Sequence, residues 1–241
     1  MKKPAIVLGI LAALALGVAL WAYNSLDVIV KLALEHYGPD VLGVPVKVSG
    51  VRISAQSGEG SLSGVEIGNP AGFTAARAAR LGAIRVSIDP MTLSEPVVWI
   101  REVALDEALI TFERGRAGSN LDAIQKHIEA YVQGSAGDRA AKSVMPGREP
   151  RRFIVERISI RGTKVTMTNP ALRGQGITFD LPDVQLRDVG KRESGLRASQ
   201  VANIVARELI SRIAQRVLGN LELLRRGGAE GAIDALKGLI R

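Results

Sequence analysis

Residues 103–112 read VALDEALITF, and residues 158–167, 55 positions further along the chain, read ISIRGTKVTM. Apolar residues stand at the first, third, eighth and tenth positions of both stretches. Alternation with a period of two is typical of a β-strand that buries one face. The central pairs Asp106-Glu107 and Arg161-Gly162 favour turns, so each stretch is predicted to fold as strand, tight turn, strand. The sequence therefore predicts a β-hairpin that occurs twice.

The same alternation continues on both sides of these stretches. A turn is predicted at residues 56–60, and a short helical stretch around residues 74–81. Together with the repeated hairpin, the alternating segments amount to about nine or ten strands. The further strands are predicted in residues 44–53, 61–67, 84–88, 176–181 and 184–189.

Other segments have apolar residues three and four positions apart, which is typical of amphipathic helices. Helices are predicted over residues 25–37, ended by Gly38-Pro39, and over residues 120–132. A longer helix begins near Ala198, and Gly227-Gly228 separates it from a shorter one over residues 229–240. The apolar stripe of the long helix consists of Val201, Ile204, Val205, Leu209, Ile213, Val217, Leu221 and Leu224.

The N-terminal segment predicts a membrane anchor. Lys2 and Lys3 precede an uncharged run of 19 residues from Ala5 to Tyr23, and a helix of that length spans about 28 Å, close to the hydrocarbon thickness of about 30 Å. The positive-inside rule places the N-terminus in the cytoplasm and the body outside it. Trp21 and Tyr23 fit the interfacial aromatic belt. A cleaved signal peptide is the alternative, and it would also export the body.

These assignments predict an α+β protein with five regions. Residues 1–24 form the transmembrane anchor, residues 25–133 a β-rich region, and residues 134–150 a linker with small residues, charges and two prolines. Residues 151–190 form a second hairpin region of the same sheet, and residues 191–241 form the C-terminal amphipathic helices.

The charge balance favours anionic partners. The formal net charge is +8 and the isoelectric point is near 10.1. Nucleic acid is discounted, because aromatic residues are only 4% of the chain and are not interleaved with the basic ones. Phospholipid headgroups are the simpler partner for a chain with an anchor. The candidate contacts in the C-terminal helix are Arg207, Arg212 and Arg216, and an ordinary solvated helix face is the alternative.

The sequence contains no recognisable catalytic constellation. There is no cysteine, which excludes disulfides and thiol catalysis. His36 and His127 each stand alone on a predicted helix, without acidic or histidine neighbours at ligand spacing. No nucleotide-binding or hydrolase motif occurs. A non-enzymatic protein is predicted, with no catalytic residue, cofactor or metal site.

A series of short motifs resembles the AsmA-like family of bacterial envelope proteins. Each motif is weak alone, but their order is characteristic, and together they cover most of residues 1–190. In that family these motifs serve the fold and are not known as catalytic residues. They are GVPV at residues 43–46, GNP at 68–70, SIDPMTL at 87–93, the strand pattern at 100–113 and GSNL at 118–121.

The resemblance implies a single-pass protein of the bacterial inner membrane with its body in the periplasm. It also implies a strongly curved, groove-like and mostly antiparallel sheet, whose apolar inner face is thought to carry phospholipid acyl chains. We expect one continuous apolar face on the strands. The lipid-groove candidates are Val46, Val48, Ile53, Leu62, Ile84, Val86, Leu105, Ile110, Ile160 and Val165.

The chain is small for a bridge across the periplasm. Nine or ten strands at about 4.8 Å each give a sheet only about 45–50 Å wide. Two functions therefore remain open: lipid handling in the cell envelope, or a structural subunit that binds a protein partner or a second copy of the chain.

Overall fold

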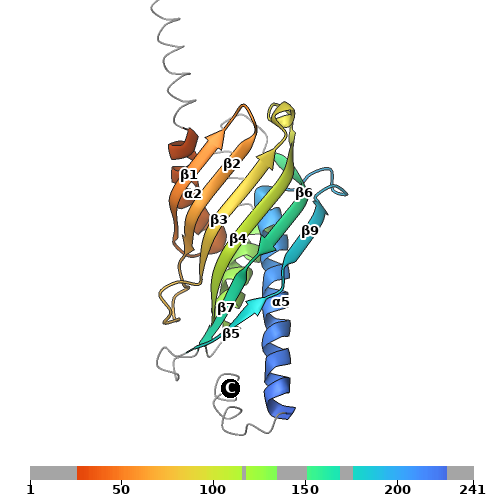
Figure 1. Ribbon diagram of the computed structural model, residues 1–241. Helices are drawn as coiled ribbons and strands as arrows, with labels where there is room; N and C mark the ends of the chain where they lie inside the picture. The colour runs from red at the N-terminus through yellow and green to blue at the C-terminus, as the bar shows by residue number, and fades with distance from the viewer. Residues whose placement is uncertain (1–25, 116–117, 135–150, 169–175, 227–241) are drawn as a thin grey trace, which may run out of the picture.

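The computed structural model describes residues 26–115, 118–134, 151–168 and 176–226, together with the side chains of these residues up to 217. This part of the chain forms two layers, an open β-sheet and a layer of helices on one of its faces (Figure 1). The sheet is antiparallel except where β4 meets β6 and β7. The predicted α+β class with a mostly antiparallel sheet is thus confirmed.

The chain enters the described part through helix α2 and then forms an antiparallel meander of four strands. Strand β4 is followed by β5 and α3, and the chain returns to the sheet parallel to β4. The helices are α2 (Leu26–Leu42), the short 3-10 helix η1 (Pro90–Thr92), α3 (Asn120–Gln133) and α5 (Ala198–Arg226). The strands are β1 (Val46–Ser54), β2 (Glu59–Ile67), β3 (Ala79–Ile88), β4 (Val97–Gly115), β5 (Gly118–Ser119), β6 (Arg152–Arg161), β7 (Thr163–Thr168), β8 (Gly176–Leu181) and β9 (Val184–Val189).

The two similar stretches of sequence are neighbouring parallel strands. Val103 of β4 pairs with Ile158, and the 55-residue offset continues through Ile110 and Val165 to Phe112 and Met167. The prediction of two hairpins was wrong, because each stretch runs in one direction. The residues read as turns are single interruptions with positive φ, 60° at Glu107 and 61° at Gly162.

At one level of the sheet, each of several neighbouring strands contains a residue that is left out of the pairing. Beyond that residue, the side chains that pointed to one face at odd positions point there at even positions. The ladder pairs skip Ser49, Gly64, Gly82 and Glu107 in β1 to β4, and Gly162 separates β6 from β7. Reversal in a single strand would turn its apolar residues to the other face. Because neighbouring strands reverse together, apolar residues three positions apart, such as Leu105 and Ala108, share one face and belong to the core.

The strand count overstates the width of the sheet. Strand β7 continues the line of β6. Strand β9 pairs with β6 and strand β8 pairs with β7, so β8 and β9 share one position at the edge of the sheet. The sheet is therefore only six strands across, in the order β1-β2-β3-β4-β6-β9. At about 4.8 Å between neighbours the sheet is roughly 24 Å wide. The predicted width of about 45–50 Å was therefore too large.

Helix α2 protects the β1 edge of the sheet. The carboxylates of Asp27 and Glu35 accept hydrogen bonds from the backbone N–H groups of Ile53, at 2.7 Å, and Val48, at 2.9 Å. Edge amides would otherwise be free to pair with another strand. Pro39, predicted to stop the helix, lies inside it. The helix ends instead at Leu42, and the next residue, Gly43, has a φ of 71° and donates its N–H to the Pro39 carbonyl at 2.8 Å.

The other two helices cover the rest of the same face. Helix α3 begins with a capping box between Ser119 and Asp122. Helix α5 contacts α3, β6 and β8 (Figure 1). Ile213 is 1% exposed in this contact, but Ile204 of the predicted stripe is 38% exposed and lies outside it.

One further prediction was wrong, and three others fall wholly or almost wholly outside the described residues. Residues 74–81 form turns and the start of β3 in place of a helix. The predicted anchor (1–24) and second C-terminal helix (229–240) lie outside the described residues, as does nearly all of the linker at 134–150. Among the helices that the structure describes, none is both long and apolar enough to cross a bilayer.

Candidate functional site

An apolar pocket lies between the start of α2 and the adjoining ends of β1, β2 and β3; we call it the α2 pocket. Its volume is about 400 Å³ and it is partly open to the surface. Sites for small molecules commonly measure about 300–1,000 Å³. Leu26 and Val30, one helical turn apart, form its helix side. The other lining residues are Val51, Ile53, Ser54, Ala55, Gly58, Glu59, Gly60, Ser61, Leu62, Val86, Ile88 and Leu93.

All ten predicted groove residues lie on the helix-facing side of the sheet. Direct cross-strand partners point to the same face, and pairs such as Leu62 with Ile84 and Ile84 with Leu105 connect the strands. Three of the ten residues, Ile53, Leu62 and Val86, line the α2 pocket.

The other seven candidates lie elsewhere on that face. Five are buried in the protein core and are not exposed to a ligand: Val48, Leu105, Ile110, Ile160 and Val165. Ile84 is half-buried and packs against this core. Val46 lies under α2, where a Cβ added at Gly38 would come within 3.0 Å of it.

The pocket also includes residues that the strand pattern did not single out. Leu26 and Val30 come from the helix, and Leu93 comes from the segment that follows η1. The spacing of four between Leu26 and Val30 was a visible sequence signal. Their position over the sheet depends on the hydrogen bonds of Asp27 and Glu35 to β1.

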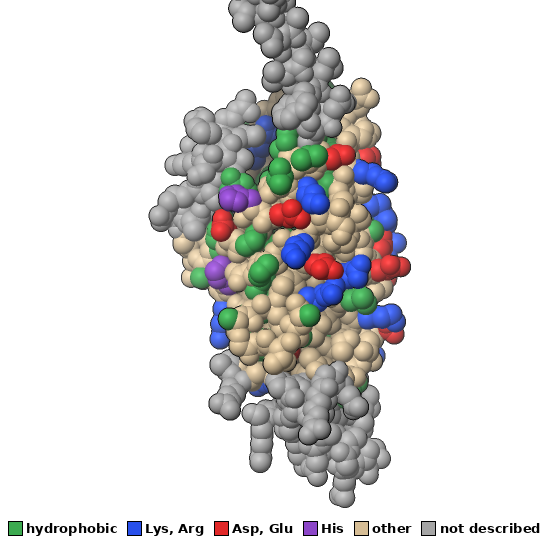
Figure 2. Space-filling view, turned by 90° about the vertical axis from the view of Figure 1, so that its left-hand side faces the viewer, with side chains coloured by type: hydrophobic (Ala, Val, Ile, Leu, Met, Phe, Trp, Pro, Cys, Tyr) green, Lys and Arg blue, Asp and Glu red, His purple; other side chains and the backbone are tan. Residues whose placement is uncertain are grey.

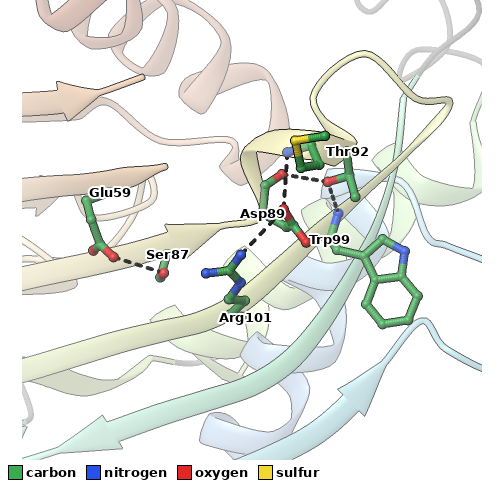
Figure 3. Close-up of polar contacts among 7 residues, drawn as sticks. Glu59, Ser87, Asp89, Thr92, Trp99 and Arg101 are labelled. Carbon is green, nitrogen blue, oxygen red and sulfur yellow. Dashed lines mark hydrogen bonds and ion pairs between the residues drawn. The ribbon is translucent and has the colours of Figure 1, made fainter. Parts of the chain in front are cut away.

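A tight turn after β3 supports one side of the pocket rim (Figure 3). Asp89 caps η1 by accepting a hydrogen bond from the Met91 N–H at 3.1 Å, and Arg101 lies 3.4 Å from the same carboxylate. The Thr92 hydroxyl donates to the Asp89 carbonyl and accepts from the Trp99 N–H. The turn thus fastens the loop containing Leu93 to β4.

Glu59 adjoins the pocket, but its side chain lies on the open face of the sheet, because the next residue, Gly60, pairs with the helix-facing Ile53 and Val86. Its side chain accepts a hydrogen bond from the Ser87 hydroxyl at 3.1 Å, across the β2–β3 ladder (Figure 3). Glu59 is the single ionisable residue among the residues that line the α2 pocket. The interior is therefore suited to hydrocarbon, and polar groups of a ligand would remain at the opening.

Three residues from separate sequence motifs meet in a buried hydrogen-bond network away from the pocket. Glu113 is 1% exposed and Asn120 is 0% exposed. The Asn120 side chain donates to the side-chain amide oxygen (Oδ1) of Asn69 at 2.8 Å, and the Asn69 side-chain NH₂ donates to the Glu113 carboxylate at 3.0 Å. The network joins the loop after β2, the end of β4 and the start of α3, so these motif residues stabilise the fold.

The electrostatics of Glu113 follow from its donors. Burial raises the pKa of this carboxyl, but hydrogen bonds from the Ala75 N–H, the Thr74 N–H and hydroxyl, and Asn69 lower it by more. The net pKa lies below the ordinary glutamate value, so the group stays ionised at neutral pH.

The predicted basic contacts on α5 differ in their surroundings. Arg207 donates to Glu129 of α3 at 2.9 Å, and Arg212 donates to Glu208 one turn earlier at 2.6 Å. Hydrogen bonds from Gln125 and then Arg207 lower the pKa of Glu129. Arg216 is exposed, and the two aromatic candidates, Trp21 and Tyr23, lie outside the described residues.

The histidines do not build a metal site with their neighbours. His127 contacts the Asp40 carbonyl at 3.1 Å, and the His36 ring packs edge-on against Tyr37. Within the part of the chain that the structure describes, no group of three His, Cys, Asp or Glu side chains is placed to hold a metal ion.

Comparison of the sequence with protein-family models and with curated proteins identified no match. No protein-family model matches the chain, and no curated protein matches it. The similarity to the AsmA-like family therefore rests on the sequence motifs alone.

Proposed function

We propose that this chain is a non-enzymatic lipid-binding protein of the bacterial envelope, anchored by residues 1–24, with its body in the periplasm. Its α2 pocket takes an acyl chain of a membrane phospholipid. The observation that carries the proposal is the pocket itself, where Leu26, Val30 and Ile53 enclose apolar space that the core leaves unfilled.

The position of the pocket in the chain supports a membrane lipid as the ligand. Leu26 lines the pocket and lies three residues after Tyr23, the end of the uncharged run. Three residues span at most about 11 Å even when fully extended. An anchor ending at Tyr23 would therefore hold the pocket close to the bilayer surface.

The shape of the body argues against a single chain that carries lipid across the whole periplasm. The sheet is six strands across, and helices bury most of its apolar face. The α2 pocket, lined by three of the ten predicted groove residues, is an accessible part of that face in the described structure. A function in taking up or presenting single lipids fits this arrangement better than a continuous channel.

Lipid extraction tests the proposal. Full-length protein purified in a mild detergent should carry phospholipid that mass spectrometry detects. Leu62→Trp should fill the pocket and reduce the bound phospholipid severalfold. Leu109→Trp is the matched control, because Leu109 is 51% exposed on the opposite face of the sheet. Equal lipid content in the two variants, with both folded, would rule out the α2 pocket as the binding site.

A structural role is the second candidate, and the long helix α5 favours it. The helix is 29 residues long and ends at Arg226. Its lower end extends past the strands (Figure 1). A projecting helix of this kind offers a surface to a protein partner. Truncation after residue 217 should then abolish partner recruitment while lipid content stays unchanged.

A further inference from the structure

Helix α2 departs from the usual arrangement for a surface helix, because large apolar side chains lie on both its sheet side and its outer side. Amphipathic helices in water turn their apolar side chains toward the protein and their charged ones outward. In α2 the carboxylates of Asp27 and Glu35 face the sheet and bind β1 amides. None of the 17 residues of the helix is buried.

Three large apolar side chains of its first two turns are directed away from the body. Val28 is 58% exposed, Ile29 is 45% exposed and Leu32 is 59% exposed. We call these three residues the α2 patch. Figure 2, which views the α2 and β1 side, shows hydrophobic side chains at the surface there, among charged ones. Contiguous exposed apolar residues usually mark an interaction site.

We infer that the α2 patch lies in the surface of the lipid bilayer and brings the opening of the α2 pocket to the lipids. This inference rests on the proposed anchor and lipid-binding function. The length of chain before the helix supports the bilayer as the occupant, because Val28 lies five residues after Tyr23. That chain reaches at most about 18 Å when fully extended, so the patch cannot be far from the membrane that the anchor would span.

The two sides of the helix would then have different roles. Leu26 and Val30 line the pocket, while Ile29 and Leu32 contact lipid. With the patch in the interface, an acyl chain leaving the bilayer meets the pocket beside the helix and does not have to cross water. The patch would then enter the headgroup and acyl boundary, where the apolar side chains of interfacial helices lie about 5–10 Å deep.

Fluorescence quenching tests the docking. The chain has no cysteine, so single cysteines at Ile29, Leu32 or Leu109 can each carry an environment-sensitive fluorophore in the full-length protein. The protein is reconstituted in vesicles of phosphatidylethanolamine and phosphatidylglycerol. Leu109 is the control, because its exposure of 51% is close to the 45% of Ile29 while it lies on the open face of the sheet.

Lipids brominated in their acyl chains should quench the probes at residues 29 and 32 about threefold or more strongly than the probe at residue 109. Aqueous iodide should give the opposite order. Equal accessibility to iodide at all three positions, without quenching by brominated lipid, would overturn the inference. A second result would also overturn it: residues 29 and 32 remain shielded from iodide in detergent, and Leu32→Cys forms a disulfide crosslink between two chains. That result would show that a second copy of the protein covers the patch.

Lipid uptake separates this inference from the proposed function. The variant V28S/I29S/L32S leaves Leu26 and Val30 of the pocket unchanged. It should take up fluorescent phospholipid from detergent micelles like the wild type, but about tenfold more slowly from vesicles. Equal uptake rates of the variant and the wild type from vesicles would overturn the inference that the α2 patch brings the pocket to the lipids. If the wild-type protein takes up no phospholipid from either source, the proposed function fails, and quenching still decides where the patch lies.

Discussion

Replacing Glu113 by glutamine is expected to lower the free energy of unfolding by about 2 kcal/mol. The side chain is 1% exposed and accepts four hydrogen bonds, from the Thr74 N–H and hydroxyl, the Ala75 N–H and Asn69. Glutamine keeps the shape but replaces one accepting oxygen with an NH₂ group. Each carboxylate oxygen receives two donors, so at least one donor loses its acceptor in either amide orientation.

The magnitude follows from the surroundings of those donors. Hydrogen bonds to a charged group contribute about 1.5–3 kcal/mol, and a buried donor without a partner costs about 1–3 kcal/mol. Thr74 is exposed at the surface, so water can replace part of what its N–H loses. We therefore expect a value toward the lower end of these ranges.

Pulse proteolysis in urea, on full-length protein in mild detergent, measures the effect. With a urea dependence of about 2 kcal/mol per molar, the midpoint should fall by about 1 M. The control is Glu66→Gln, which removes a partly exposed ion pair with Arg77 and should cost less than about 1 kcal/mol. A midpoint for Glu113→Gln equal to that of the control would refute the assignment of the network as a stabilising element.

The same variant has a defined pH dependence. Because the pKa of Glu113 is lowered in the folded protein, its ionised form stabilises the fold at pH values above the unfolded pKa of about 4.3. This contribution is lost as the pH falls through the folded pKa. The stability difference between wild type and Glu113→Gln should accordingly be largest near neutral pH and shrink below about pH 4. A difference that grows in acid would contradict the lowered pKa.

Three further outcomes are expected. Gly64→Ala should destabilise the body by about 1–2 kcal/mol, since φ is 57° and the added Cβ would lie 2.5 Å from the Ser49 hydroxyl oxygen; urea midpoints check this. Ile213→Ala should cost about 2–5 kcal/mol because the side chain is 1% exposed, whereas Ile204→Ala, at 38% exposed, should cost less than about 1 kcal/mol in the same assay. A reporter fused after Arg241 should be active only in the periplasm, and the chain should stay in the membrane after a carbonate wash; release of a shortened, soluble form would show that the N-terminal segment is a cleaved signal peptide.

Local periodicity was sufficient to predict most elements. The alternation at residues 176–181 and 184–189 predicted β8 and β9 with the observed bounds, and the helical spacing at 120–132 predicted α3. These signals are local, because a strand or helix with one buried face repeats its apolar residues at the period of its own backbone. The end of α2 was misplaced, since contacts with β1 and α3 keep the helix intact through Pro39 despite a cost of about 3 kcal/mol.

The apolar face of the sheet was also predictable, but the sequence did not show which of its residues are covered by helices and which line a pocket. All ten groove candidates share one face, as their alternation indicated. Helix packing then determined that Ile160 and Val165 are buried while Leu62 and Val86 line a pocket. An apolar residue looks the same in a sequence whether a helix or a ligand covers it.

The similarity between residues 103–112 and 158–167 determined that both are strands with an interruption at the same position. Tertiary structure alone decided that they pair in parallel as neighbours, because a residue with positive φ serves equally well in a tight turn and in an interrupted strand. The same holds for Asn69, Glu113 and Asn120, whose residue types are visible in the sequence but whose network exists only where three distant segments meet. Long-range pairing depends on which surfaces bury each other, and that information is not contained in any local stretch of the chain.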